Sequence, residues 1–225
     1  MCGIVGFTGK QQAAPILLDG LSKLEYRGYD SAGLAVRDGK ALAEKTDGGK
    51  TLKGTCGIGH TRWATHGEPS QVNAHPHVSG NCLRSGSGEV ESEVVGVHNG
   101  IIENYTELKE KLLKHGYTFY SQTDTEVVIK LVDYYYKKYN LGPIDAIAKT
   151  MVRVRGSYAL ELMFRDYPGE IWVARKDSPM IIGIADGETY VASDVPAILK
   201  YTRNVYYIGN LEFAKLTPGE AHFYN

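Results

Sequence analysis

Apolar residues come in short blocks whose spacing predicts the elements of the fold. The first block, Gly3 to Phe7, is apolar, punctuated by glycine and free of charge, which predicts a buried strand at the start of the chain. Between Gln11 and Tyr26 apolar residues fall on one helical face, so a helix is expected there. Further strands are expected at 32–36, at 40–45, from 56 onward, and from 94 onward, where the strand should stop at Asn99-Gly100.

The middle of the chain has the spacing of helices. Asn104 with Glu107, and Thr123 with Glu126, have the spacing of a capping box, in which two side chains at a helix start bond to each other's backbone N–H groups. They predict helices to about residue 115 and through residue 139, and a third helix is expected over 144–154.

From Ser157 onward the pattern changes to short strands at close spacing, interrupted by a short helix near 195–200. The strands are expected at 158–164, 170–174, 181–185, 189–192, 205–208, 212–216 and 221–223. Strands, then three helices, then strands again predict an α+β fold with two sheets covered by helices, not the alternating order of a doubly wound fold. The sequence has no internal repeat and no linker composition, which favours one domain.

Composition narrows the class of protein. The 225 residues are 43% apolar and 23% charged, which is ordinary for a globular chain with a core. A net charge of −1 favours neither nucleic acid nor an anionic membrane as partner, and no apolar run approaches the roughly 18–20 residues that span a bilayer. The three cysteines, Cys2, Cys56 and Cys82, lack paired spacing, so the cytoplasm is expected, not an oxidising compartment.

Candidate chemistry starts at Cys2. Removal of Met1 would leave a residue with both a thiol and a free α-amine, whose reference pKa values are about 8.5 and about 7.7–8.0. Near neutral pH the amine can therefore act as a base toward the thiol, as in N-terminal nucleophile enzymes. If Met1 stays attached, the amine is locked in an amide and an inactive molecule is expected. The alternative interpretation is that Cys2 has no catalytic role and is simply a small residue at a frayed chain end.

Three other positions allow two interpretations each. Asn99-Gly100 has the composition of a turn, but an Asn amide and a neighbouring backbone N–H can also form an oxyanion hole. Arg62 is either a surface charge or a bidentate partner for a carboxylate. Asp124 is explained as a first-turn acid at a helix N-terminus, or as a counter-ion for an ammonium group.

The histidines raise the question of a metal site. His66, His75 and His77, with Cys56 or Cys82, are of the residue types that bind zinc. Their spacing is against it, because no CxxC or HxxxH pair occurs and an extended segment would direct the two imidazoles that flank a proline to opposite sides. No metal and no organic cofactor is expected.

Six short motifs, read in order, carry a resemblance to a known family. They are MCGIVG at 1–6, YRGYDS at 26–31, HTRWATHG at 60–67, NAHPH at 73–77, HNGIIEN at 98–104 and TDTE at 123–126. Together they resemble the glutaminase domains of the glutamine–fructose-6-phosphate aminotransferases, which make glucosamine 6-phosphate and are class II glutamine amidotransferases. The resemblance covers essentially the whole chain.

The resemblance implies one glutaminase domain over residues 1–225 with the N-terminal nucleophile hydrolase fold, a four-layer αββα sandwich of two antiparallel sheets. It implies that Cys2 is the nucleophile and that its own α-amine is the general base. The Asn99 side chain and the Gly100 backbone N–H would form the oxyanion hole. The expected reaction is hydrolysis of L-glutamine to glutamate and ammonia through a γ-glutamyl thioester.

The same resemblance implies how glutamine would be held. Arg62 would bind its α-carboxylate, with help from Thr65 and His66, and Asp124 would bind its α-ammonium group. Trp63 would belong to a loop that closes over the substrate. A zwitterionic amino acid needs one fixed cation and one fixed anion, so Arg62 and Asp124 also fit this role on chemical grounds.

Supporting roles and partners follow from the resemblance as well. Arg27 would order the nucleophile, and His75 would lie toward a sugar-phosphate isomerase domain that binds fructose 6-phosphate in the longer enzymes, which are expected to be homo-oligomers. That domain is expected to be absent from this chain, which ends at Asn225. The alternatives are another class II amidotransferase, such as the phosphoribosylamine-forming one, and a non-catalytic module that binds zinc or a sugar phosphate.

Overall fold

Two antiparallel sheets form the centre of the computed structural model, which describes residues 2–25, 31–38, 41–45, 52–62, 67–80, 88–89, 92–140 and 142–225. Within these residues sheet A has eight strands, in the order β12 (Val205–Tyr207), β10 (Ile181–Ala185), β11 (Glu188–Ala192), β1 (Gly3–Thr8), β4 (Cys56–Arg62), β2 (Ser31–Asp38), β3 (Ala41–Lys45) and β6 (Gly88–Glu89). Sheet B has six, in the order β14 (Glu220–Tyr224), β13 (Glu212–Thr217), β9 (Ile171–Lys176), β8 (Gly156–Phe164), β7 (Val94–Ile102) and β5 (His77–Val78).

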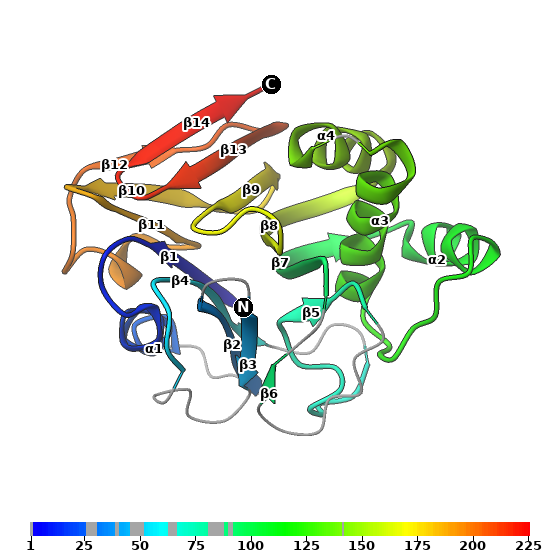
Figure 1. Ribbon diagram of the computed structural model, residues 1–225, viewed down its shortest axis with the longest axis horizontal. Coiled ribbons are helices and arrows are strands. Elements are labelled where there is room, and N and C mark those ends of the chain that lie inside the picture. The colour runs from blue at the N-terminus through cyan, green and yellow to red at the C-terminus, as the bar shows by residue number, and fades with distance from the viewer. Residues whose placement is uncertain are drawn as a thin grey trace.

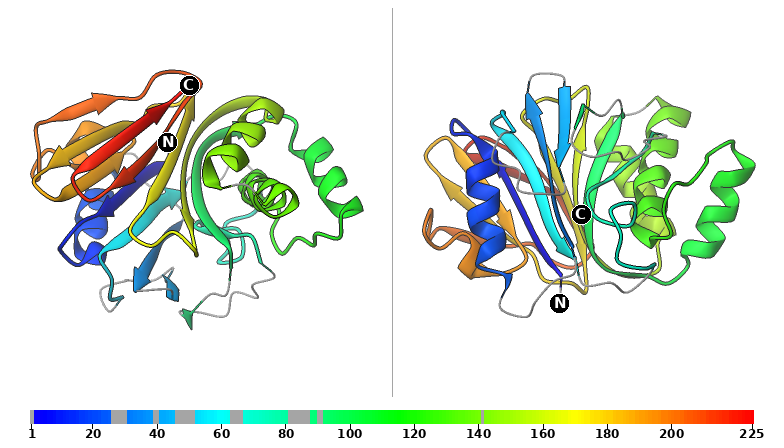
Figure 2. Two further views of the ribbon diagram at one scale, coloured as in Figure 1. Left: turned by 45° about the horizontal axis from the view of Figure 1, so that its top comes forward. Right: turned by 90° about the horizontal axis from the view of Figure 1, so that it is seen from below.

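Helices cover the outer face of each sheet, so the molecule has four layers (Figures 1 and 2). Helix α1 (Ala13–Ser22) packs on sheet A, and α3 (Asp124–Tyr139) and α4 (Pro143–Arg153) pack on sheet B. Helix α2 (Tyr105–Lys114) lies outside α3 (Figure 1). This arrangement is the predicted αββα sandwich.

Three apolar clusters fill the spaces between the four layers. Ile4, Ile58, Val97 and Val191 belong to the cluster between the two sheets. A second cluster joins sheet A to α1, and a third joins sheet B to α2, α3 and α4. Because side chains alternate along a strand, buried strands such as β1, β7 and β8 each contribute to two of these clusters.

Strand β1 lies in the interior of sheet A, between β11 and β4. Val5 is opposite Ala192 on one side and opposite Gly59 on the other. All six residues of β1 are buried, as the apolar sequence of this segment predicts. The residue that precedes β1, Cys2, is therefore attached to one of the most enclosed strands of the molecule.

Two local predictions are wrong. Strand β7 does not stop at Asn99-Gly100 but pairs with β8 as far as Ile102, so this pair is part of the strand and not a turn. Asn104 precedes α2, yet its side chain does not cap the helix. Its amide instead bonds to the backbone at the end of α4, through the carbonyl oxygen of Arg153 and the N–H of Arg155, both at 2.9 Å.

Most other predictions of elements are confirmed, with small changes of length. The helix expected over 11–26 is shorter, and the helix expected near 195–200 is a single 3-10 turn over Val195–Ala197. The capping box at the start of α3 is half formed: Thr123 Oγ1 accepts from the Glu126 N–H at 3.4 Å, while the Thr123 N–H bonds to Ser121 Oγ. Among the described residues no helix is long and apolar enough to cross a membrane.

Candidate active site

A cavity of about 460 Å³ opens where β1 begins and β4 ends, beside the start of α3. It is lined by Cys2, Arg62, His75, His98, Asn99, Gly100, Ile101, Thr123, Asp124, Thr125, Ser157, Asp177, Ser178 and Pro179. Six residues to which the sequence assigns a site role therefore share one cavity, although they are spread over more than half of the chain: Cys2, Arg62, His75, Asn99, Gly100 and Asp124.

Strand alternation explains why three of these side chains meet. Ile4 of β1, Ile58 of β4 and Val97 of β7 all face the space between the sheets. Counting in steps of two from each of them reaches Cys2, Arg62 and Asn99, so all three face the same space. The apolar pattern that builds the inter-sheet core thus also directs the polar residues at its edge toward one another.

The backbone that follows Cys2 is held by hydrogen bonds to two side chains. The Gly3 N–H donates to Thr61 Oγ1 at 3.1 Å, and the Ile4 N–H donates to Ser193 Oγ at 3.2 Å. The carbonyl oxygen of Cys2 accepts from the side-chain amide of Asn99 at 3.0 Å. Cys2 itself is only half-buried and lines the cavity, so its position is fixed while its side chain stays accessible.

Gly100 occupies a position that only glycine fits. Its φ of +121° is outside the range of ordinary L-residues, and a Cβ atom there would lie 2.2 Å from the Ser157 carbonyl oxygen. This backbone lies beside Asn99 at the wall of the cavity. Two consecutive residues thus present an amide side chain and a closely packed backbone to the same space.

Asp124 is the first residue of α3 and is buried. Its Oδ2 atom accepts from the Ile102 N–H at 2.9 Å, which ties the helix start to the end of β7. The carboxylate therefore stands at the wall of the cavity with a fixed orientation. Arg62, also buried, donates from its guanidinium to the carbonyl oxygens of Gly67 and Glu68, at 3.3 and 3.5 Å.

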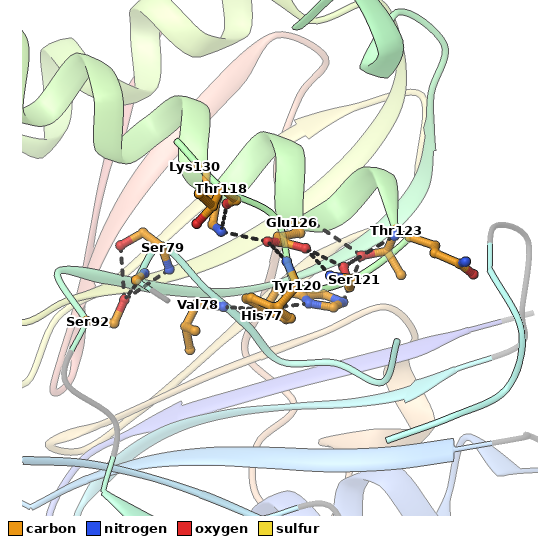
Figure 3. Close-up of polar contacts among 12 residues, drawn as sticks. His77, Val78, Ser79, Ser92, Thr118, Tyr120, Ser121, Thr123, Glu126 and Lys130 are labelled. Carbon is orange, nitrogen blue, oxygen red and sulfur yellow. Dashed lines mark hydrogen bonds and ion pairs between the residues drawn. The ribbon is translucent and has the colours of Figure 1, made fainter. Parts of the chain in front are cut away.

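A buried polar network supports the start of α3 (Figure 3). The Glu126 carboxylate accepts from the N–H groups of Tyr120 and Ser121, at 3.0 and 2.7 Å, and forms an ion pair with Lys130 at 2.7 Å. Both side chains of the pair are almost completely inaccessible, and the Lys130 ammonium also donates to the Thr118 carbonyl oxygen. The backbone of the segment before α3 thus donates hydrogen bonds to one buried carboxylate.

Four histidines, His60, His75, His77 and His98, are buried near the cavity, and two of them, His75 and His98, line it. His60 stacks on His75 with ring centroids 3.8 Å apart, and His75 meets His77 edge-on at 4.9 Å. Burial, with a contribution from His98, lowers the pKa of His60 to about 3, and burial lowers the pKa of His75 well below its usual value. Both rings are therefore neutral at physiological pH.

The histidines do not make a metal centre among the described residues, where no group of three or more His, Cys, Asp or Glu side chains has a suitable arrangement. The expectation that His75 and His77 point to opposite sides is wrong, because their rings are in edge-on contact. Cys56 is buried between the sheets, which raises the pKa of its thiol to about 12. It is therefore a packing residue and not a second nucleophile.

Four predicted site residues, Arg27, Trp63, Thr65 and His66, lie outside the described residues. In the other direction, the cavity includes residues to which sequence reasoning assigned no role: Ile101, Thr125, Ser157, Asp177, Ser178 and Pro179. The last three belong to the connection between β9 and β10, where no residue pattern indicated chemistry. A left-handed Asp177, with φ of +55°, is visible only in the structure.

Comparison with known proteins agrees with this geometry. The model of the glutamine amidotransferase domain family matches residues 87–200, which is half of the chain and includes Asn99, Gly100 and Asp124. The chain belongs to this family.

Two curated relatives carry the same name. The chain is 49% identical over 234 residues to the glutamine–fructose-6-phosphate aminotransferase (isomerizing) of Caldanaerobacter subterraneus subsp. tengcongensis, covering 99% of this chain and 36% of the relative. It is 44% identical over 236 residues to the enzyme of that name from Aquifex aeolicus, covering 100% of this chain and 38% of the relative. The chain thus spans a little over a third of the length of the curated relatives it matches.

Two solved structures share the fold. Glutamine phosphoribosylpyrophosphate amidotransferase from B. subtilis superposes with a TM-score of 0.80 at 25% identity, over 99% of this chain and 49% of that one. A glutamine aminotransferase class-II domain protein from Silicibacter pomeroyi, at 11% identity, gives a TM-score of 0.65 over 100% of this chain and 98% of that one. The predicted N-terminal nucleophile hydrolase fold is therefore confirmed.

Proposed function

We propose that this chain hydrolyses the side-chain amide of L-glutamine to glutamate and ammonia, with Cys2 as the nucleophile. The observation that carries the proposal is the shared cavity of Cys2, Asn99, Gly100, Arg62 and Asp124. A nucleophile, two candidate oxyanion donors, a cation and an anion are the groups that this reaction and this substrate require. The cavity volume of about 460 Å³ leaves ample room for one amino acid.

The two charged residues suit an amino acid substrate. Arg62 presents a planar cation that can hold an α-carboxylate bidentately, and Asp124 presents a buried anion for an α-ammonium group. Because both side chains are fixed by bonds to backbone groups, they would hold glutamine with its side-chain amide in one position. Trp63, Thr65 and His66 are proposed to complete the binding site, with Arg27 and His75 in support.

The chemistry needs no group beyond the chain and water. The Cys2 thiol gives its proton to the α-amine that removal of Met1 exposes, and the sulfur attacks the amide carbon. The Asn99 side chain and the Gly100 N–H receive the negative oxygen of the tetrahedral intermediate. The C–N bond then breaks, the amine returns the proton to the leaving nitrogen, and ammonia departs. Water cleaves the resulting thioester, which releases glutamate and restores the thiol.

In a longer protein the ammonia would be used by a second domain. The names of the relatives support fructose 6-phosphate as acceptor, so we propose that this chain is the glutaminase part, residues 1–225, of an enzyme that makes glucosamine 6-phosphate in the cytoplasm, as a homo-oligomer. The chain alone should then yield glutamate and free ammonia when fructose 6-phosphate is added. Formation of glucosamine 6-phosphate by this chain would contradict its assignment as the glutaminase part only.

Trapping the nucleophile tests the proposal most directly. A glutamine-like electrophile should form one adduct that peptide mass spectrometry places on Cys2, and excess glutamate should slow its formation. Cys56 is the internal control, because its buried thiol should stay unmodified. The intact mass should be lower than the printed sequence by one methionine. An adduct elsewhere, or full glutamine hydrolysis by Cys2→Ala, would refute the proposal.

A phosphoribosylamine-forming enzyme is the second candidate. The sequence identity of 25% with glutamine phosphoribosylpyrophosphate amidotransferase favours it. It shares the proposed glutaminase chemistry and differs in the acceptor of ammonia. Identity of 49% with the fructose-6-phosphate enzymes supports the first candidate more strongly. A module that binds zinc or a sugar phosphate without catalysis would leave glutamine unchanged in the same assay.

A further inference from the structure

His60 is a buried histidine to which the proposed mechanism gives no role. Its Nε2 atom lies 3.1 Å from the carbonyl oxygen of His98 and 3.1 Å from Asn99 Oδ1. A carbonyl oxygen only accepts hydrogen bonds, so Nε2 carries the proton. One N–H group is therefore shared between two oxygens of consecutive residues on β7.

This proton and the Cys2 carbonyl oxygen together decide which way the Asn99 amide faces. With its oxygen held by the His60 N–H, the amide turns its NH₂ group toward Cys2, where it donates to the carbonyl oxygen at 3.0 Å. The NH₂ group has a second proton, and Asn99 lines the cavity, so this proton is the one that a negative oxygen in the cavity would meet. A flipped amide would present its own oxygen there and repel such a charge.

The His60 ring cannot easily turn away. It is completely buried and lies nearly parallel to the His75 ring, with 14° between their planes. His75 is itself fixed, because its Nδ1 accepts from the His98 N–H at 3.4 Å and its Nε2 lies 3.3 Å from Thr125 Oγ1. His60 Nδ1 has no hydrogen-bond partner among the described residues, so only Nε2 and the stacking define the orientation of the ring.

We propose that His60 is a positioning residue for the oxyanion hole: its Nε2–H fixes the orientation of the Asn99 side chain, so that the amide NH₂ faces the reacting atoms. The inference rests on the proposed glutaminase function. It gives a role to a residue of the HTRWATHG motif that the proposed mechanism does not otherwise use. It also explains why a polar imidazole is buried at this position. A phenylalanine of similar shape could be buried there at a lower cost in desolvation free energy.

The test compares variants that keep or remove the donor. His60→Phe keeps the flat ring and its stacking on His75 but has no N–H, while His60→Gln keeps an amide N–H that can reach Asn99. Steady-state glutamine hydrolysis should show kcat lowered roughly 10- to 100-fold in H60F, with KM changed less than about two-fold, because the contact weakened by a misoriented Asn99, its bond to the oxyanion, is made only in the transition state. H60Q should recover a large part of kcat.

A double-mutant cycle separates positioning from general damage. If His60 acts only through Asn99, adding H60F to Asn99→Ala should lower kcat no further than N99A alone. An equal loss in both backgrounds, a change confined to KM, or full activity of H60F would overturn the inference. Activity of N99A equal to that of the unchanged protein would refute the proposed oxyanion hole instead. If H60F does not fold, His60→Met, a flexible side chain without a donor, takes its place in the cycle.

Discussion

The side-chain amide of Asn99 donates a hydrogen bond to the carbonyl oxygen of Cys2 at 3.0 Å. The bond joins β7 of sheet B to the residue that precedes β1 of sheet A. The proposed oxyanion donor and the proposed nucleophile are thus fixed to each other directly, and do not depend on a mobile loop for their spacing. This relationship is the basis for the first prediction.

Asn99→Ala should lower kcat for glutamine hydrolysis by roughly 10²–10³, which is the usual cost of removing one oxyanion donor. KM should stay within a few-fold, since Arg62 and Asp124 hold the α-groups of the substrate in the proposed complex. Steady-state kinetics with ammonia detection measure both constants. A large rise in KM with unchanged kcat would show that Asn99 binds the ground state and not the oxyanion.

Asp124→Asn should mainly change KM and leave kcat less affected, in contrast to Asn99→Ala. The variant keeps an oxygen that can accept from the Ile102 N–H but loses the charge that would pair with an ammonium group. A hydrogen bond to a charged group contributes about 1.5–3 kcal/mol, so KM for glutamine should rise roughly 10- to 100-fold with a smaller change in kcat. Glutamate inhibition, measured in parallel, should weaken by a similar factor. Unchanged binding of both molecules would remove Asp124 from the substrate site.

Gly100→Ala should destabilise the fold more than the same substitution at a positive-φ glycine where an added Cβ atom has no clash. Gly116→Ala is the matched control, because Gly116 also has a positive φ, of +85°, and a Cβ there meets nothing within 4 Å. The control should lower the free energy of unfolding by about 1–2 kcal/mol. Gly100→Ala adds a clash with the Ser157 carbonyl oxygen, so its loss in urea unfolding should be clearly larger. Equal losses would mean that the backbone at Gly100 relaxes freely.

Glu161 should make the protein less stable as pH rises. It is fully buried between the sheets, neither carboxylate oxygen has a partner among the described residues, and burial raises its pKa well above the usual value. The folded state therefore keeps a proton that the unfolded chain releases near pH 4.3, so this residue's contribution to stability falls by up to about 1.4 kcal/mol per pH unit above that point.

Glu161→Gln removes this dependence, because the amide does not titrate. Urea unfolding of both proteins at several pH values should show the variant gaining stability relative to the unchanged protein as pH increases. Glu107→Gln, at an exposed position on α2, is the control and should keep the slope. Parallel pH profiles for the unchanged protein and Glu161→Gln would mean that Glu161 finds a compensating partner.

Glu126→Ala should be among the most damaging substitutions outside the cavity. It would leave the Lys130 ammonium buried without its carboxylate, and would free the N–H groups of Tyr120 and Ser121. Breaking a buried pair in this way costs about 3–5 kcal/mol. Lys138→Ala is the control in the same helix. Lys138 is exposed and its ammonium donates to the neutral Tyr134 hydroxyl, so this substitution should cost less than about 1 kcal/mol. Thermal unfolding of the two variants gives the comparison.

Much of the fold could be predicted because strands and helices here follow their sequence periodicity. The apolar run Gly3–Phe7, the helix after Thr123 and the strand 181–185 are found where their patterns place them. Errors arise where a polar residue has more than one use. Asn104 has the composition of a helix cap but bonds to the end of α4, which is distant in sequence. Asn99-Gly100 has the composition of a turn but lies within a paired strand.

The residue types that could carry out the chemistry of the candidate site were predictable from the sequence. The residues that position them were not. Cys2, Asn99 and Asp124 could be chosen because their residue types suit the reaction, and the cavity brings them together. His60 could not be given a role, because its contribution depends on which atom of Asn99 it contacts in space. The residues from the β9–β10 connection, Asp177 and Ser178 among them, join the cavity through topology alone.

The interior position of β1 has a consequence for biosynthesis. One edge of β1 pairs with β4, but the other pairs with β11, at residues 188–192. A nascent chain that has not yet reached β11 leaves one side of its first strand without hydrogen bonds. Cys2 therefore acquires its final surroundings only after residues 188–192 have been synthesised, so the proposed nucleophile and the cavity around it cannot be assembled before that point.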